Sequence, residues 1–318
     1  MGGGHWSNDF YEERARQRAA TNTPAFKHDA DVRSGKVSTA LHADLDPSKL
    51  KNGVRESRDS AEHPNSVPVL FELDVTGSMR EVPGIVQKNL GKLMTTILTG
   101  GFLPDPQILF AAIGDSRTDR VPLQVGQFES GNQIEEDLTK IYIEGNGGGS
   151  GEEGYEMGLY FAVRHTATDA WEKRKRKGYL FIAGDEHAYS EAHPDSIHKI
   201  FGGERPTKGV SLTEIVAEAK ERYHVFFIIP AGTIHARDQH LFEHWAELLG
   251  ADHVLRLQDP SQICDLVALT IGLTEGTAKP EALKALSPAI KEAIDPVLAG
   301  TKSVIADAKK KNEKTARL

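Results

Sequence analysis

Short apolar runs alternate with longer helical patterns from Val67 onwards. The apolar runs predict strands at Val67–Leu73, Gln107–Ile113, Gly178–Ala183, Tyr223–Ile229 and His253–Leu257, with a weaker strand at Val121–Phe128. The helical spacing predicts helices at Val86–Leu98, Gln133–Tyr142, Tyr155–Thr166, Leu212–Tyr223, Asp238–Leu249 and Pro260–Leu273. Strands that alternate with helices of this length are typical of βαβ units, and near-continuous apolar strands are typical of parallel sheets covered on both faces. We therefore predict a doubly wound α/β fold with a mostly parallel central sheet flanked by helices.

The two ends of the chain differ in composition from this region. Residues 1–66 are polar and predict an extended or partly helical arm, with a short amphipathic helix at Asn8–Ala20 that docks on its own domain. Docking on a partner or a neighbouring subunit is the alternative. Residues 67–275 form the expected main domain. Residues 276–318 predict a helical extension, with a helical pattern over Pro280–Leu298 that Pro288 and Pro296 interrupt, and a basic tail.

Charge and composition limit the partners and the compartment that we expect. The formal net charge of −8 argues against nucleic acid as the main partner, since such surfaces usually show a basic excess. Cys264 is the single cysteine, so no disulfide can form within the chain. The N-terminus has no apolar segment typical of a secretory signal, and the apolar runs are too short to span a membrane. We expect a cytoplasmic protein that does not enter a membrane.

Polar side chains follow several of the predicted strands. The first strand is followed by Asp74, Thr76 and Ser78, the second by Asp115 and Ser116, and the strand Gly178–Ala183 by Asp185, Glu186 and His187. A glycine-rich loop adds Ser150, Glu152 and Glu153 at a helix start. Ligands of open α/β sheets gather at the carboxyl ends of the strands, so these side chains are expected to converge.

The residue types at this edge suit a hard cation. Asp74, Thr76 and Ser78 offer a carboxylate and two hydroxyls at alternate positions, and Gly77 allows a tight turn between them. Oxygen ligands without cysteine favour Mg²⁺, with Mn²⁺ or Ca²⁺ as alternatives. Asp74 and Ser78 could instead cap the following helix. Asp115 could hold or polarise the metal ligands without binding the metal itself, or it could simply begin a turn.

The run "LDVTGSM" and the later run "IAGDE" resemble two loops of the metal-ion-dependent adhesion site (MIDAS) of von Willebrand factor type A (VWA) domains. In that family the first loop reads Asp-x-Ser-x-Ser, a second loop supplies a Thr, and a later strand supplies an Asp. The resemblance covers about Val67 to Leu273. It implies a Rossmann-like VWA fold and a metal held by Asp74, Thr76, Ser78 and Asp185.

The second loop, Gly147 to Gly154, departs from the common Gly-Gly-Thr form. It is similar to a subgroup with Gly-Gly-Gly-Asp-Gly-Pro-Glu, in which Ser150 replaces Asp and Glu153 matches Glu. The resemblance implies a further ligand from Ser150, Glu152 or Glu153, and we include Ser150 and Glu153 in the predicted metal site.

Three functions fit these features. The resemblance implies a non-enzymatic protein–protein interaction module, in which Mg²⁺ binds an Asp or Glu of a partner; intracellular relatives often work with AAA+ ATPases or in larger assemblies. A metal-dependent phosphoester hydrolase would use Glu153, Glu186 and His187 as acid–base groups. A self-assembling component would use its terminal arms to clasp neighbouring subunits and could form an oligomer.

Other motifs favour ordinary structural roles. The histidine groups His187, His193, His198 and His235, His240, His244 lack cysteine and the zinc-protease pattern, so surface histidines are expected. His187 differs because it directly follows Asp185 and Glu186: it is expected to border the site, with a role as a base in the metal cleft as the alternative. The basic run Trp171–Tyr179 predicts a solvated helix end, with a phosphate or acidic-partner patch as the alternative. The chain has no Gly-x-Ser-x-Gly and no P-loop motif.

Overall fold

The computed structural model describes residues 4–145, 151–278, 287–298 and 300 of the 318-residue chain. Its centre is a six-stranded sheet in the order β12-β11-β7-β2-β3-β4. The strands are β2 (Ser66–Asp74), β3 (Asp105–Ile113), β4 (Leu123–Val125), β7 (Gly178–Ala183), β11 (Tyr223–Pro230) and β12 (Val254–Leu257). All neighbouring strands pair in parallel except β3 and β4, which pair antiparallel. The predicted mostly parallel α/β sheet is confirmed, and the weak strand prediction at Val121–Phe128 shrinks to three residues.

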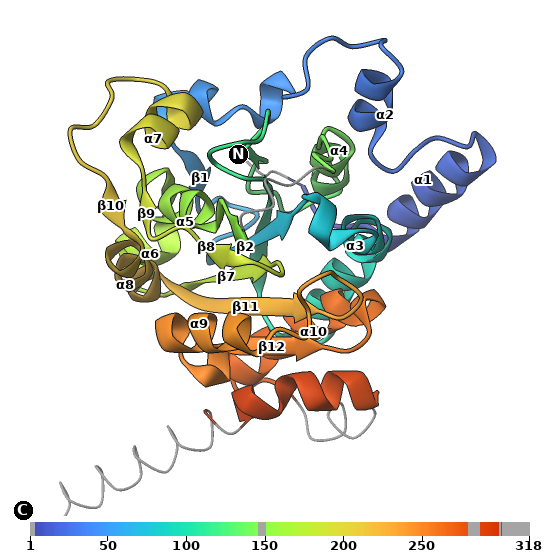
Figure 1. The fold of residues 1–318 in the computed structure, drawn as a ribbon. Helices are drawn as coiled ribbons and strands as arrows, with labels where there is room; N and C mark the ends of the chain where they lie inside the picture. Colours follow the sequence, from blue (N-terminus) through green and yellow to red (C-terminus); the bar gives the residue numbers. More distant parts are fainter. Residues whose placement is uncertain (1–3, 146–150, 279–286, 299, 301–318) are drawn as a thin grey trace, which may run out of the picture.

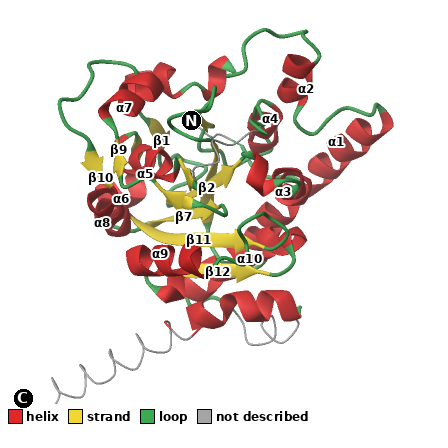
Figure 2. Cartoon of the chain, viewed as in Figure 1, coloured by secondary structure: helices red, strands yellow, loops and turns green. Residues whose placement is uncertain are grey.

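Helices cover both faces of this sheet, as Figures 1 and 2 show. Alternate residues of β2 explain the two layers: Val69 and Phe71 pack into one apolar core, while Leu70 packs into the other. The first core also takes residues of α3 (Val82–Thr99), α4 (Gln133–Thr139) and α10 (Ile263–Thr274). The second takes residues of α5 (Tyr155–Arg164), α7 (Pro194–Phe201), α8 (Leu212–Arg222) and α9 (Gln239–Leu249).

Short elements complete the described chain. Two-stranded pairs join β1 (Arg55–Ser57) to β6 (Thr166–Thr168), β5 (Glu152–Glu153) to β8 (His187–Ala188), and β9 (Glu191–Ala192) to β10 (Val210–Ser211). Two short α-helices are α2 (Lys27–Arg33) and α6 (Asp169–Arg174). The 3-10 turns are η1 (Ala43–Leu45), η2 (Pro47–Lys49), η3 (Lys51–Gly53), η4 (Gly77–Met79), η5 (Ala251–His253) and η6 (Pro260–Gln262). None of the described helices is both long and apolar enough to cross a membrane.

The C-terminal extension is helical over residues 288–298. Ile290, Ala293, Ile294 and Val297 from this helix are buried in the core that contains α3 and α10. Pro288 is the first helical residue, where proline loses no hydrogen bond, and residues 279–286 before it lie outside the described residues. Pro296 lies within the helix, so the expected interruption at Pro296 is wrong. The basic tail also lies outside the described residues.

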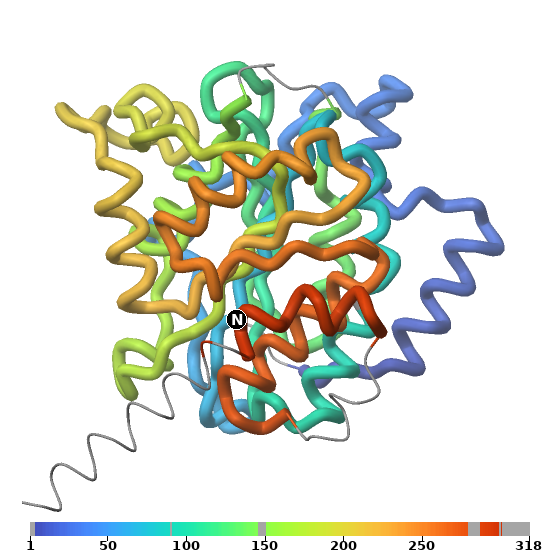
Figure 3. Tube along the Cα trace, turned by 60° about the horizontal axis from the view of Figure 1, so that its bottom comes forward, coloured from blue at the N-terminus to red at the C-terminus, as the bar shows by residue number. Residues whose placement is uncertain are grey.

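The N-terminal helix α1 (Asn8–Ala20) has the predicted bounds and docks on its own domain. It stands at the edge of the molecule beside α3 (Figure 3). None of its residues is fully buried, so an apolar face does not hold it. Instead, the Tyr11 hydroxyl donates to the Lys88 carbonyl at 3.2 Å, and Arg18 pairs with the buried Glu135.

Gly91 of α3 makes the close approach of Tyr11 possible. A Cβ at position 91 would lie 2.3 Å from two carbons of the Tyr11 ring. We expect Gly91→Ala to push α1 off α3 and to speed trypsin cleavage at the arginines of α1 several-fold, because overpacking forces one element to move. The matched control is Gly84→Ala in the same helix, where a Cβ meets nothing within 4 Å. Equal cleavage of both variants would show that Tyr11 does not hold the arm.

Candidate metal centre

The order in which strands are added to the sheet reverses at β2. From β2 the chain adds β3 and β4 on one side of β2, and it later adds β7, β11 and β12 on the other side. Asp74 is the last residue of β2, and Asp185 follows β7 by two residues. Both carboxylates are fully buried at the carboxyl edge. Such a reversal point is where ligands bind in open α/β sheets.

Four of the predicted ligands form one chain of hydrogen-bonded oxygens. The Thr76 amide and hydroxyl both donate to Asp74 Oδ1, at 2.8 and 2.6 Å. The Thr76 and Ser78 hydroxyl oxygens lie 3.1 Å apart, and Ser78 Oγ donates to Asp185 Oδ1 at 2.6 Å. The structure therefore brings Asp74, Thr76, Ser78 and Asp185 together.

The alternative role of Asp74 and Ser78 as helix caps is wrong. The N-cap of α3 is Glu81, and it makes no side-chain capping bond. The Ser78 hydroxyl is used by Asp185 instead. The helix begins at Val82, four residues before the predicted start, because Pro83 at its first turn favours helix initiation there.

The Tyr155 hydroxyl connects the Asp74 carboxylate to the backbone of Asp185. Its hydroxyl donates to Asp74 Oδ2 at 2.5 Å and accepts from the Asp185 amide at 3.2 Å. A Cβ on Gly184 would lie 2.2 Å from this hydroxyl, so only glycine leaves room for it. The His235 amide donates to Asp185 Oδ2 at 2.9 Å. Groups that hold metal ligands in this way fix their orientation.

We expect Tyr155→Phe to weaken Mg²⁺ binding by about 10- to 100-fold, because it removes the bond that orients the Asp74 carboxylate and the one that holds the Asp185 backbone. It should also destabilise the fold by about 1–3 kcal/mol, since the Asp185 amide loses its partner. The control is Tyr223→Phe, which removes another buried hydroxyl, one that bonds to Thr166 at 2.7 Å away from the site. Calorimetric Mg²⁺ titration of both variants separates the effects. Equal Mg²⁺ affinity in both would contradict a positioning role for Tyr155.

The glycine-rich loop reaches this edge through the short β5–β8 pair, in which Glu153 lies opposite Ala188. The Glu153 side chain is 1% exposed, and its Oε2 has no hydrogen-bond partner among the described residues. Burial and the nearby charge of Asp74 raise the pKa of Glu153 to about 10. Ser150 lies outside the described residues, and Glu152 borders a cavity next to Asp185.

The acidic residues of this edge hold their protons more tightly than free carboxylates. Burial raises the pKa of Asp74 to about 7, and burial together with the charge of Asp185 raises the pKa of Glu186 to about 7. Within the described chain, oxygens of Asp74, Glu153 and Asp185 do not all come within 4.8 Å of one another. The hydroxyls of Thr76 and Ser78 bridge Asp74 to Asp185. This all-oxygen set fits a hard divalent cation, whose charge would favour the ionised carboxylates.

Asp115 begins a turn, which agrees with one of the two predictions for this residue. Its Oδ1 accepts from the Arg117 amide at 2.8 Å, and its Oδ2 accepts from the Thr118 hydroxyl at 2.7 Å. The Tyr189 hydroxyl donates to the same carboxylate at 3.1 Å. These local bonds use the Asp115 oxygens, although its charge contributes to the raised pKa values of Glu153 and Glu186.

Two cavities border the candidate site. One of about 680 Å³ is lined by Asp185, Glu186, His187, His235 and His244, with Leu241 among its apolar walls. Within it His235 Nε2 lies 3.4 Å from Glu186 Oε1, and the rings of His187 and His244 are 4.8 Å apart. His187 thus lines the cavity next to Asp185, and His240 is a surface histidine with an 87% exposed side chain.

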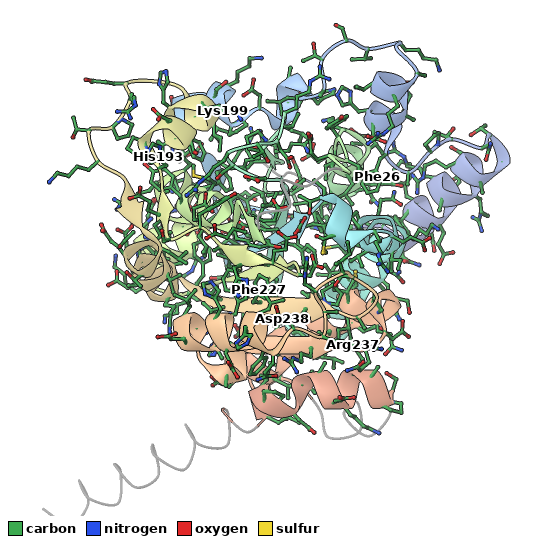
Figure 4. All side chains as sticks on the ribbon, viewed as in Figure 1. Phe26, His193, Lys199, Phe227, Arg237 and Asp238 are labelled. Carbon is green, nitrogen blue, oxygen red and sulfur yellow. The ribbon has the colours of Figure 1, made fainter. Side chains whose placement is uncertain are left out.

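The second cavity, the arginine cavity, has a volume of about 610 Å³ and is lined by Arg80, Arg237 and Arg256, with no acidic side chain among the described residues of its wall. Its loop 231–237 contacts the site directly, because the Ile234 amide donates to the Ser78 carbonyl at 3.1 Å. The Ile234 side chain is 56% exposed, which is unusual for a large apolar residue in this protein. Figure 4 shows Arg237 and Asp238 on the segment that leads from β11 to α9.

The basic run Trp171–Tyr179 is occupied by contacts within the chain. Lys173 pairs with Asp169, Arg174 with Asp59, and Arg176 with Glu275. Lys175 lies over the Trp171 ring, and Lys177 donates to the Lys220 carbonyl. These contacts favour a structural helix end over a phosphate patch.

The comparisons with known proteins leave the family open. No family model and no curated protein matches the chain. Among solved structures, the open conformation of the pilus adhesin SpaC from Lactobacillus rhamnosus GG aligns with 69% of this chain and 31% of that chain, at 11% identity and a TM-score of 0.45. Proximal thread matrix protein 1 from the mussel byssus aligns with 66% of this chain and 46% of that chain, at 12% identity and a TM-score of 0.42. The chain thus spans less than half of either protein, and at these TM-scores the likenesses carry no argument.

Proposed function

We propose that this chain is a VWA-like interaction module whose MIDAS-like site binds Mg²⁺ and, through it, a carboxylate of a protein partner. The observation that carries the proposal is the chain of oxygens from Asp74 through Thr76 and Ser78 to Asp185. Two carboxylates and two hydroxyls are fewer than the six ligands that Mg²⁺ prefers, so water or a partner's oxygen completes the shell. Glu153 would lie beside that shell. The setting we propose is cytoplasmic, within a larger assembly such as one built on an AAA+ ATPase.

The surroundings of the site support an acidic partner. Arg80 and Arg237 are exposed beside it, and the exposed Ile234 lines the same cavity and bonds through its amide to the Ser78 carbonyl. Interfaces of this kind combine an apolar centre with charges that steer the partner. A protein of net charge −8 that gathers arginines next to its candidate metal is suited to a partner segment with several Asp or Glu residues.

The test is capture of a partner from an extract of the source cells by the immobilised full chain, with Mg²⁺ or with EDTA. Wild type and the control Asp9→Ala, which changes an exposed aspartate of α1, should capture the same protein only with Mg²⁺. Asp74→Ala should capture none. Arg80→Glu with Arg237→Glu should lose the partner while Mg²⁺ binding stays unchanged. Capture by Asp74→Ala, or capture in EDTA, would refute the proposal.

Metal-dependent hydrolysis is the second candidate, and the pair of His235 and Glu186 favours it. The two side chains face each other at 3.4 Å in the cavity next to Asp185, where they could pass a proton to a substrate near the metal. Phosphoester turnover with Mg²⁺ or Mn²⁺ that Asp74→Ala and His235→Ala both abolish would favour this candidate. No turnover by wild type would leave the interaction module.

A further inference from the structure

A second group of metal-ligating side chains lies at the opposite edge of the sheet. Asp105 begins β3 and pairs with Ser66, whereas Asp74 pairs with Ile113 at the other end of the same two strands. The eight residue steps from one end of these strands to the other correspond to roughly 25 Å. His5, Glu62 and His63 gather beside Asp105, so their chemistry is separate from that of the candidate metal centre.

The geometry of this group suits a transition metal. One ligand atom from each of His5, Glu62 and His63 lies within 4.8 Å of the other two, and no other such trio occurs in the described part of the chain. The rings of His5 and His63 have centroids 5.0 Å apart. Two imidazoles and one carboxylate form a common ligand set for Zn²⁺, with water in the fourth position.

His63 is held in the orientation that a metal ligand needs. The residue is 5% exposed, and its Nδ1 lies 3.4 Å from Asp105 Oδ1. Asp105 is itself fixed, because its Oδ2 accepts from the Asn65 amide at 3.0 Å. An imidazole whose second nitrogen faces a carboxylate is the usual arrangement behind a zinc-bound histidine.

The other nitrogen of His63, Nε2, faces a backbone oxygen. Nε2 lies 3.0 Å from the Gly4 carbonyl, so both ring nitrogens face oxygen atoms. A neutral imidazole carries only one N–H and can donate to only one of them. A second ring proton would let both nitrogens donate, and a cation bound at Nε2 can take its place: Nδ1–H then donates to Asp105, and the Gly4 carbonyl becomes a further oxygen beside the cation.

The segment that carries His5 is anchored on both sides. The Ser7 amide donates to Asn132 Oδ1 at 2.9 Å, and Asn132 Nδ2 donates to the Ser7 carbonyl at 3.0 Å. On the other side the Gly4 carbonyl faces His63. His5 is therefore placed near Glu62 and His63 by contacts that do not involve its own side chain.

We propose that His5, Glu62 and His63 form a zinc site that fastens the N-terminal segment to the start of β3. The ion joins residue 5, near the start of the arm, to residues 62 and 63 at its end, where His63 faces Asp105 of the main domain. Asp105 acts as the positioning residue behind His63. The site is independent of the proposed interaction function.

The test is competition of the full chain with a chromophoric chelator for Zn²⁺, in saturating Mg²⁺. Wild type, Asp74→Ala and the surface control His240→Ala should bind one Zn²⁺ with equal affinity. His5→Ala and Glu62→Gln change exposed residues, so they should fold normally and lose at least about tenfold in affinity. His63→Ala should lose more, and Asp105→Asn should lose about 10- to 100-fold. Zn²⁺ should also slow hydrogen exchange of the amides at residues 4–7 in wild type but not in His5→Ala.

Failure of wild type to compete for Zn²⁺ would overturn the proposal. Wild-type affinity in both His5→Ala and Glu62→Gln would do the same. Loss of Zn²⁺ binding in Asp74→Ala would place the ion at the candidate metal centre instead, so failure here is distinguishable from failure of the proposed function.

Discussion

Asp74→Ala is expected to lower the affinity for Mg²⁺ by at least about 100-fold, the largest effect of any single change at the site. Asp74 accepts two bonds from Thr76 and one from Tyr155, so its loss removes a ligand and the group that orders a second one. Calorimetric titration of Mg²⁺ into the purified full chain measures the change.

Two further variants make this result interpretable. Asp74→Asn keeps the side-chain shape and should fold, but its neutral amide should still cost most of the Mg²⁺ affinity. Asp9→Ala changes an exposed aspartate in α1 and should bind Mg²⁺ as wild type does. Circular dichroism of each variant shows whether the fold survives. Wild-type affinity in a folded Asp74→Asn would show that the carboxylate is no ligand.

Glu72→Leu is expected to stabilise the protein, by on the order of a few kcal/mol at pH 8. Glu72 lies in the middle of β2 with no exposed surface, and neither of its oxygens has a hydrogen-bond partner among the described residues. Its Oε2 occupies the space over Gly158, where a Cβ would lie 2.4 Å away. A buried unpaired carboxyl costs free energy that a leucine of similar volume does not.

For the same reason, the free energy of unfolding should fall as the pH rises. Burial raises the pKa of Glu72 to about 8, above its ordinary value of 4.5, so the folded state keeps a proton that the unfolded chain releases. Stability from this residue is therefore present below about pH 4.5 and is lost as the pH rises towards 8. A tenfold change in an acid constant corresponds to about 1.4 kcal/mol, which sets the scale of the loss.

Chemical denaturation of wild type and variants between pH 5 and pH 9 measures this effect. Glu72→Leu and Glu72→Gln should both flatten the decline, and the exposed Glu221→Gln should leave it unchanged. A decline of equal slope in wild type and Glu72→Gln would show that Glu72 is not the cause.

The sequence predicts the sheet well because its strands are buried on both faces. The strand at Gly178–Ala183 has the predicted bounds, and β2 and β11 differ from prediction by one residue at their ends. Continuous apolar runs mark such strands whatever surrounds them. The positions of two loops directly after predicted parallel strands also predicted that Asp74, Thr76, Ser78 and Asp185 lie at one edge of the sheet.

The groups that support the site could not be found in the same way. Tyr155 reads as the first residue of an apolar helix, and its bond to Asp74 depends on Gly184, which comes 29 positions later. The β5–β8 pair that places Glu153 is only two residues long and carries no periodic pattern. Ion pairs between α1 and α4 likewise depend on the tertiary fold, so the sequence showed that the arm forms a helix but not what holds it.

The claim that a bound divalent ion offers a coordination position to a carboxylate can be tested without knowing the partner. The measurement is the NMR linewidth of ¹³C-labelled acetate in the presence of Mn²⁺ and the full chain. Mn²⁺ replaces Mg²⁺ at oxygen sites and broadens the resonance of any carboxylate that binds to it. We predict that wild type broadens the acetate signal beyond the level of free Mn²⁺ and that Asp74→Ala does not. Equal broadening by the two proteins, or an unaffected acetate signal when wild type is loaded with Mn²⁺, would contradict the account.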